Sequence, residues 1–343
     1  MGDFLQTLLN ASEKAANIAR SCVGLSDISD SLLVAEKCES EANSRFDKDF
    51  KTIADVLAQE TARSIIIKDY PELKDNVRGE ECAEICGHEI KLLNTEAETE
   101  KLLKSVVTAN LASQMAKAAH SDVQNDYSSL ICDGLPEVDT TNLGVWIDPI
   151  DATAEFIAGV QGNAKPGAGL ECVTVLIGAY LRTTGEPVLG VINQPFYKNG
   201  KGRVMWGLSF DGFHKWGGNH IEETSTTKVI LMSNAEESKI KQKLLNSSFN
   251  IDTAPGAGNK LMKVALGEAI GYVLSKGTTF LWDTCAPHAI LKAKGGDIKT
   301  FKFNKCIKYN IPECDDNQQY CNSDGIIAYA NDVIFNDFKK AFV

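Results

Sequence analysis

The sequence predicts an α+β fold in which helices and mixed or antiparallel sheets are stacked in layers. Three observations support this prediction. Residues 1–120 have mainly helical periodicity, the segment from residue 143 consists of β-rich runs between turn residues, and the last third alternates between the two patterns. Helices and sheets that alternate in such blocks are typical of stacked layers.

Helices are expected in the N-terminal part of the chain. The first 20 residues are amphipathic and have no basic region before a hydrophobic one, so they predict a helix and not a signal peptide. Residues 50–60 predict a second helix, because apolar side chains recur at i, i+3, i+4 and i+7 from Phe50. An acid, Asp55, lies within this pattern.

A third helical segment is expected over residues 94–120. It opens with Thr95 and Glu98, which are spaced as a capping box, and continues with apolar residues at helical spacing. Between the helices, residues 65–70 (IIIKDY) and the residues around Val77 are short apolar runs that we expect to be extended.

The middle of the chain is predicted to form strands. Glycine-bounded turns such as RTTGEP indicate hairpins, and hence an antiparallel or mixed sheet. The C-terminal third predicts a helix over residues 259–269, a strand over residues 270–275 and a further helix that ends at Gly295. The β-rich runs are residues 143–147, 171–181, 187–196, 201–210 and 228–233.

Composition and charge exclude several classes of protein. A net charge of −11 argues against nucleic-acid binding, which needs a basic surface. The chain has no apolar run of about 18 residues, so no membrane-spanning helix is expected. The ten cysteines are scattered, and Cys82 and Cys86 lack a partner pair at zinc-site spacing. We therefore expect a cytoplasmic protein in a reducing compartment, and a monomer.

WIDPIDATAEF, residues 146–156, is the stretch with the most specific chemistry. Asp148 follows an apolar run that is expected to end as a strand at Ile147, and a proline then turns the chain. Across such a turn Asp148 and Asp151 can point at one place, and burying both carboxylates requires a cation. A helix that begins near Thr153 would leave backbone N–H groups free to hold an anion. Because two carboxylates would repel that anion, this arrangement indicates a divalent metal ion between the anion and the carboxylates.

Two further acidic features stand apart in the sequence. Glu80 and Glu81 follow a glycine, and Asp283 lies at the expected start of a helix. Each has a simpler interpretation, Asp283 as a helix N-cap and the glutamate pair as part of a solvated loop. Oxygen-rich clusters that meet phosphate select Mg²⁺ over a calcium cage.

Three motifs in this order, GEE, DPIDAT and WDTCAPHAIL, resemble the signatures of the lithium-sensitive, magnesium-dependent phosphomonoesterases of the inositol monophosphatase superfamily. The likeness runs from about residue 47 to residue 297. It implies the layered α/β/α/β/α sandwich of that superfamily, a small-molecule phosphate ester as substrate, hydrolysis by a metal-activated water, and inhibition by lithium.

The resemblance also implies a cofactor of two to three Mg²⁺ ions. Asp148 would bridge two of them, and a third, looser ion would lie near Glu80. The implied metal ligands are Glu80, Glu81, Asp148, the carbonyl of Ile150, Asp151 and Asp283.

The implied catalytic residues are Asp55, Thr153 and Glu80. Asp55 and Thr153 match the pair that orients and polarises the attacking water in the superfamily. That role would account for an acid inside the helix predicted over residues 50–60, although a solvated helix residue is the simpler alternative.

The substrate loop of the superfamily is matched by PGAGNK, residues 255–260. Lys260 would pair with a second phosphate as a point charge. The simpler alternative is that Lys260 begins a helix in solvent. The implied substrate contacts are Asp151, Ala152, Thr153, Gly256, Ala257 and Lys260.

Three positions depart from the superfamily pattern. Ala152 stands where a serine is usual, so one side-chain hydrogen bond to phosphate is lost. Ala235 and Glu237 stand where the relatives place Ser and Lys near the distal phosphate. A glutamate at that place would repel the phosphate, so substrate affinity or preference is expected to differ.

The resemblance favours the branch that removes the 1-phosphate from inositol 1,4-bisphosphate and inositol 1,3,4-trisphosphate. PGAGNK and WDTCAP also resemble the 3′-nucleotidases, which leaves hydrolysis of adenosine 3′,5′-bisphosphate as the alternative activity. The non-enzyme alternative is a metal- or phosphoinositide-binding protein that retains the fold.

A soft domain boundary is expected in residues 215–228, which are rich in Gly, Ser and Thr. Residues 1–215 would form an N-terminal α+β domain with most of the metal ligands. Residues 216–343 would form a C-terminal α/β domain with the substrate loop and Asp283.

Overall fold

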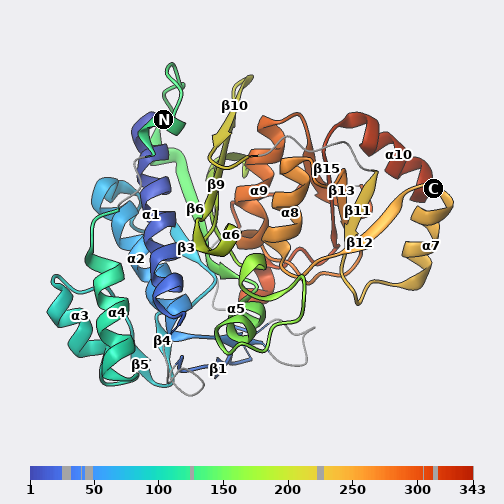
Figure 1. Cartoon of the computed structure of the whole chain (residues 1–343). Helices are drawn as coiled ribbons and strands as arrows, with labels where there is room; N and C mark the ends of the chain where they lie inside the picture. Colours follow the sequence, from blue (N-terminus) through green and yellow to red (C-terminus); the bar gives the residue numbers. More distant parts are fainter. Residues whose placement is uncertain are drawn as a thin grey trace.

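The structure is a computed structural model that describes residues 1–24, 32–39, 41–42, 49–123, 127–221, 228–303, 305–311 and 316–342. Two sheets alternate with layers of helices, in the order helix, sheet, helix, sheet, helix (Figure 1). The layered α+β prediction is therefore confirmed. Among the described residues, no helix has the length and apolar character needed to cross a membrane.

The first sheet has the strand order β10-β9-β8-β7-β6-β3. Its neighbours are antiparallel except for β3 and β6, which are parallel. The hairpin of β7 and β8 contains the RTTGEP turn, as predicted. The strands are β3 (Val77–Gly79), β6 (Leu143–Asp151), β7 (Thr174–Leu181), β8 (Pro187–Gln194), β9 (Arg203–Phe210) and β10 (Phe213–Gly218).

The second sheet has the order β12-β11-β13-β15-β14 and is mixed. Strand β11 is parallel to both of its neighbours, whereas β15 is antiparallel to β13 and β14. The strands are β11 (Val229–Met232), β12 (Asn250–Thr253), β13 (Gly271–Leu274), β14 (Asp297–Thr300) and β15 (Ile326–Tyr329). The remaining strands form two small ribbons, β1 (Ala35–Glu36) with β2 (Phe50–Lys51) and β4 (Glu84–Ile85) with β5 (His88–Glu89).

The helices cover both sheets. Helices α1 and α2 lie on the outer side of the first sheet, α8 and α9 lie between the sheets, and α7 and α10 lie beyond the second sheet (Figure 1). Each gap between layers holds its own apolar cluster. The helices are α1 (Gly2–Ser21), α2 (Ile53–Asp69), α3 (Glu96–Leu103), α4 (Ala109–His120), α5 (Thr153–Val160), α6 (Tyr197–Gly200), α7 (Ser238–Asn246), α8 (Ala257–Leu266), α9 (Leu281–Ala293) and α10 (Asp332–Phe342). Single 3₁₀ turns lie at Pro71–Leu73, Ser128–Leu130, Thr140–Asn142, Gly169–Cys172 and Asn317–Tyr320.

A row of three glycines sets the distance between α9 and the first sheet. Gly178 of β7 pairs with Gly190 of β8, which pairs with Gly207 of β9. A Cβ on Gly178 would lie 2.5 Å from the backbone nitrogen of Ala286, and one on Gly207 would lie 2.6 Å from Cα of Ile290. A Cβ on Gly190 would overlap the carbonyl of Ala286. Helix α9 can therefore approach the sheet as closely as it does only because these positions have no side chain.

The helix expected over residues 50–60 begins later than predicted. Phe50 belongs to the short strand β2, and α2 begins at Ile53, because Thr52 is an N-cap whose side chain accepts the N–H of Asp55. The prediction of an extended segment over residues 65–70 is wrong. Residues 65–69 continue α2 and Tyr70 is its C-cap, since Ile66 is buried in the apolar cluster beneath the first sheet.

The helix expected over residues 94–120 is two helices. The capping box of Thr95 and Glu98 is confirmed at the start of α3, but Thr108 caps a second helix, α4. Strand β6 is longer than expected, because it continues past Ile147 to Asp151. The domain boundary expected at residue 215 falls within β10, and the division into two domains stays a prediction.

We expect Gly190→Ala to lower the free energy of unfolding by about 1–3 kcal/mol, the usual cost of overpacking, because its methyl group would push α9 off the sheet. Urea unfolding followed by circular dichroism measures this change. Gly2→Ala is the matched control, since a Cβ on Gly2 meets no atom within 4 Å. Equal stabilities of the two variants would contradict the close approach.

Candidate active site

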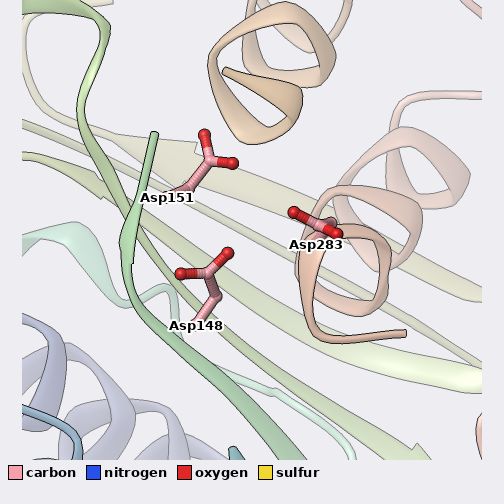
Figure 2. A group of neighbouring side chains, drawn as sticks. All are labelled: Asp148, Asp151 and Asp283. Carbon is pink, nitrogen blue, oxygen red and sulfur yellow. The ribbon is translucent and has the colours of Figure 1, made fainter. Parts of the chain in front are cut away.

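The carboxylates of Asp148 and Asp151 lie close together at the end of β6. Side chains three residues apart on a regular strand point to opposite faces. Here the pairing with β7 shifts register between Asp148 and Asp151, around a proline that cannot donate to the ladder. The irregularity turns both carboxylates toward one place, as the sequence predicts (Figure 2).

The third carboxylate of the cluster comes from the far end of the chain. Asp283 lies in the first turn of α9, where its Oδ2 accepts the backbone N–H of Phe280 at 2.6 Å. Asp148, Asp151 and Asp283 each offer an oxygen that lies within 4.8 Å of the other two (Figure 2). Asp283 therefore caps the backbone N–H at the start of α9 and also faces the two aspartates of β6.

The environment of these aspartates disfavours three negative charges. All three are buried, and burial together with the neighbouring acids raises the pKa of Asp148 and of Asp283 well above the usual value. Burial also raises the pKa of Asp151 to about 6. Asp148 Oδ1 is buried without a hydrogen-bond partner among the described residues. An orphaned carboxylate oxygen in a cluster of hard oxygen donors fits a divalent cation.

Asp151 is the best supported of the three carboxylates. Its oxygens accept the backbone N–H groups of Ala257 at 3.2 Å and Gly258 at 3.0 Å, and the hydroxyl of Thr174 at 3.1 Å. The two N–H groups belong to the N-terminus of α8, where unpaired donors favour an anion.

Glu80 and Glu81 share a buried cation that sequence reasoning missed. The ammonium group of Lys37 lies 2.5 Å from Glu80 Oε1 and 2.8 Å from Glu81 Oε1. Burial alone would lower the pKa of Lys37, but the two carboxylates raise it well above the usual value, so the ammonium stays charged. No local sequence pattern marks this pairing, because Lys37 precedes Glu80 by 43 residues.

Asp55 and Thr153 are brought together as the resemblance implies. The hydroxyl of Thr153 lies 3.1 Å from Asp55 Oδ1 and 3.2 Å from the carbonyl of Ile150, so one hydrogen serves two possible acceptors. The other oxygen of Asp55 accepts the backbone N–H of Thr52 at 2.8 Å. Asp55 is buried, not solvated, and burial raises its pKa to about 6.

The turn between β6 and α5 has an unusual backbone. Ala152 adopts the left-handed region with φ of 71°, and α5 begins at the next residue, Thr153, as predicted. A non-glycine residue in this region is strained, and such strain is often found at functional sites.

The substrate loop is tightly tied to the carboxylate cluster. Gly256 has φ of 76°, and a Cβ there would lie 2.9 Å from Asp151 Oδ2. The N–H of Ala257 donates to Asp151 instead of facing open space. Lys260 donates to the carbonyls of Ala254 at 2.9 Å and Gly256 at 2.6 Å, and burial lowers its pKa to about 8. Lys260 is therefore buried and does not begin a helix in solvent.

These groups surround one pocket of about 330 Å³ between the two sheets. It contains most of the residues expected at the site; Asp55 and Glu81 are not part of its lining, and Asp55 reaches it through Thr153. Glu237 is also absent from this lining and instead faces a different cavity beside α7. The expected residues that line the pocket are Glu80, Asp148, Ile150, Asp151, Ala152, Thr153, Gly256, Ala257, Lys260 and Asp283.

The cysteines play no part in this pocket. The nine cysteines in the described part of the chain are all free, and none of them lines it. Cys82 lines a different cavity and lies 3.0 Å from the ammonium group of Lys51.

Residues 31–334 match the inositol monophosphatase family. The chain belongs to this family. It is 37% identical to the inositol polyphosphate 1-phosphatase of Bos taurus, over 97% of this chain and 95% of the relative. It is 39% identical to the inositol polyphosphate 1-phosphatase of Homo sapiens, over 90% and 86% of the two chains. The resemblance drawn from GEE, DPIDAT and WDTCAPHAIL is thereby confirmed.

Other relatives are more distant. The 3′(2′),5′-bisphosphate nucleotidase 1 of Homo sapiens is 27% identical over 92% of this chain and 87% of the relative. The extragenic suppressor protein suhB of Bartonella henselae has a TM-score of 0.56 at 15% identity, with 99% and 98% of the chains covered. The inositol monophosphatase of Thermotoga maritima has a TM-score of 0.56 at 15% identity, with 99% and 97% covered. At such identities the solved structures confirm the shared fold alone.

The metal-free protein is expected to lose stability as pH rises. Folded Asp148, Asp151 and Asp283 have raised pKa values, so the folded chain holds more protons than the unfolded one, and the free energy of unfolding falls with pH. The fall begins near pH 4, the usual carboxyl value, and continues through about pH 6, where Asp151 titrates.

Urea unfolding in EDTA between pH 5 and pH 8 measures this slope. Excess Mg²⁺ should flatten it, because a bound cation stabilises the ionised carboxylates. Asp148→Asn should make the slope in EDTA shallower. A metal-free protein whose stability rises over this range would contradict the proposed repulsion.

Proposed function

We propose that this chain is a Mg²⁺-dependent phosphomonoesterase that removes the 1-phosphate of inositol 1,4-bisphosphate and inositol 1,3,4-trisphosphate. The observation that carries the proposal is the meeting of three buried carboxylates with the Asp55–Thr153 pair at one pocket. The identity of 37–39% to curated inositol polyphosphate 1-phosphatases supports the substrate class.

The carboxylate cluster would hold the metal ions. Asp148, with its unpartnered oxygen, suits a bridging position, and Asp283 and Asp151 face it. Glu80 lines the same pocket and would complete a second ion site with the Ile150 carbonyl. Bound Mg²⁺ would supply Lewis-acid stabilisation of the phosphate and of the leaving oxygen, and would acidify a water.

The residues of this chain would handle the proton of the attacking water. When the Thr153 hydroxyl donates to Asp55 Oδ1, its oxygen lone pairs are free to accept a hydrogen bond from a water in the pocket. The pair then orients the water and leads its proton toward Asp55. The anchor of Asp55 on Thr52 fixes the direction of this chain of hydrogen bonds.

Two alternatives are weaker. The nucleotidase activity is expected from the loop resemblance, but the nucleotidase relative is only 27% identical, against 37–39% for the polyphosphate 1-phosphatases. A protein that only binds metal or phosphoinositide would not need the buried Asp55–Thr153 pair. Lithium inhibition, a cytoplasmic location and a monomeric state stay predictions.

Asp55→Asn should lower kcat by about 10²–10⁴-fold while leaving Mg²⁺ affinity nearly unchanged. An amide at this position that still accepts the Thr52 N–H presents its NH₂ to Thr153, so the Thr153 hydroxyl becomes an acceptor and the proton path is blocked. Steady-state kinetics and calorimetric Mg²⁺ titration measure the two effects.

Glu98→Gln is the matched control for this substitution. Glu98 occupies the same position in the capping box of α3 as Asp55 does in α2, far from the pocket. Its variant should keep full activity. An active Asp55→Asn enzyme would refute the water-orienting role, and inactivity of both variants would indicate a general loss of folding.

A substrate panel tests the reaction itself. Inositol 1,4-bisphosphate, inositol 1,3,4-trisphosphate, inositol 1-phosphate and adenosine 3′,5′-bisphosphate are incubated with and without Mg²⁺, and phosphate release and product identity are measured. We expect Mg²⁺-dependent loss of the 1-phosphate from the two inositol polyphosphates. Equal or faster turnover of the nucleotide would reassign the substrate, and no turnover of any ester would favour the non-enzyme alternative.

A further inference from the structure

Helix α2 contacts the Glu80–Glu81 segment through a buried glutamine that lies outside the pocket. Gln59 follows Asp55 by one helical turn, so the two side chains lie on the same face of α2. Only 3% of Gln59 is exposed, and Gln59 does not line the active-site pocket. The helix that carries the water-handling acid therefore also carries a polar side chain directed at the glutamate pair.

The side-chain amide of Gln59 holds the backbone of Glu81 at two points. Its Oε1 accepts the N–H of Glu81 at 2.8 Å, and its Nε2 donates to the carbonyl of Glu81 at 2.5 Å. The amide thus pairs with both polar main-chain groups of one residue. Both bonds are buried, so removal of the glutamine would leave a backbone donor and a backbone acceptor without these partners.

Gly79 makes room for this amide. A Cβ on Gly79 would overlap the side-chain oxygen of Gln59. Gly79 is not among the glycines with a positive φ, so its backbone conformation is open to other residues. The glycine of the GEE motif is therefore explained by the space that Gln59 occupies, and not by the turn of the chain.

The Glu80–Glu81 segment is tied on both sides to elements that carry site residues. The N–H of Glu80 donates to the carbonyl of Ile147 at 3.1 Å, which ties it to β6, the strand with two of the aspartates. Gln59 ties the next residue to α2, the helix with Asp55. The backbone of the glutamate pair is therefore held between the two elements whose side chains meet at the pocket.

The carboxylates of the pair are held in a different way from their backbone. Lys37 lies within 2.8 Å of an oxygen of each, and a metal ion at Glu80 would compete with this ammonium. Glu81 Oε2 is buried without a hydrogen-bond partner in the described part of the chain. Gln59 binds main-chain groups only, so its restraint does not compete with an ion for the carboxylate oxygens.

We propose that Gln59 is a positioning residue that fixes the backbone of Glu80 and Glu81, and so sets the affinity of the metal site to which these carboxylates belong. This inference rests on the proposed Mg²⁺-dependent function. Because Gln59 does not line the pocket, its loss would weaken Mg²⁺ binding and would leave the binding of the phosphate ester unchanged.

Gln59→Met tests the proposal, because methionine has a side chain of similar length and makes neither hydrogen bond. We expect calorimetric titration of the substrate-free protein to show about 10–100-fold weaker Mg²⁺ binding, the usual effect of losing a group that orients a metal ligand. Activity should fall at low Mg²⁺ and recover at saturating Mg²⁺ to within about threefold of the wild type, with an unchanged KM for inositol 1,4-bisphosphate.

Gly79→Ala is an independent test that keeps Gln59 in the chain. Its methyl group would displace the amide of Gln59, so Mg²⁺ affinity should fall in this variant as well. In a Gln59→Ala background the space is empty, and Gly79→Ala should cost little more, because changes that act through one contact are not additive. Equal losses from Gly79→Ala in both backgrounds would overturn the proposal.

Gln194→Met is the matched control. Gln194 is also a buried glutamine, and its Nε2 donates to the backbone carbonyl of Glu171, but it does not line the active-site pocket. Its variant should lose stability and keep the Mg²⁺ affinity and kcat of the wild type. Wild-type Mg²⁺ affinity in Gln59→Met, or the same loss of affinity in Gln194→Met, would refute the positioning role.

The wild type separates this proposal from the proposed function. If the wild type binds Mg²⁺ but hydrolyses none of the inositol phosphates, the substrate assignment fails, and the calorimetric comparison with Gln59→Met still decides the role of Gln59. If the wild type hydrolyses the esters and binds Mg²⁺ no better than Gln59→Met, the proposed function stands and this inference fails. A wild type that binds no Mg²⁺ would refute both.

Discussion

Repulsion among buried carboxylates is the constraint on which the rest of this structure depends. Each of the three aspartates is held in a different way, and each time a backbone segment supplies the restraint. Asp148 is aimed by a register shift in β6, Asp151 is held by the N-terminus of α8, and Asp283 is held by the backbone N–H of Phe280 at the start of α9. Because the backbone supplies these restraints, the carboxylates can be kept together before a cation neutralises them.

The layered fold brings the three aspartates together, although they and their restraints come from distant parts of the sequence. Helix α9 lies between the sheets, and the glycine row of β7, β8 and β9 fixes how near its first turn comes to β6. A larger residue in that row would move Asp283 away from Asp148 as well as loosen the core. Packing and site geometry therefore depend on the same three positions, although none of them touches the pocket.

The sequence predicts best those features that local chemistry decides. The capping box of Thr95 and Glu98, the strands after residue 143 and the close approach of Asp148 and Asp151 all follow from short patterns. Residues 65–70 were mispredicted because isoleucine favours strands, whereas contacts with the core keep this segment in α2. The ion pairs of Lys37 could not be foreseen, since they join segments that only the folded chain brings together.

Binding of a metal ion at the Glu80 carboxylate would be a cation exchange, because the ion would compete with the ammonium group of Lys37. A lysine ammonium already pairs with Glu80 and with Glu81, so an arriving ion meets a carboxylate that has a counter-charge, not a bare one. The affinity observed for that ion would be a difference between two favourable interactions, weaker than the ligand set alone suggests. Lys37 directly follows β1, which pairs with β2 just ahead of α2 and Asp55. Lys37 would therefore couple the binding of this ion to the position of the β1–β2 ribbon. Through that ribbon it would also couple ion binding to the position of Asp55.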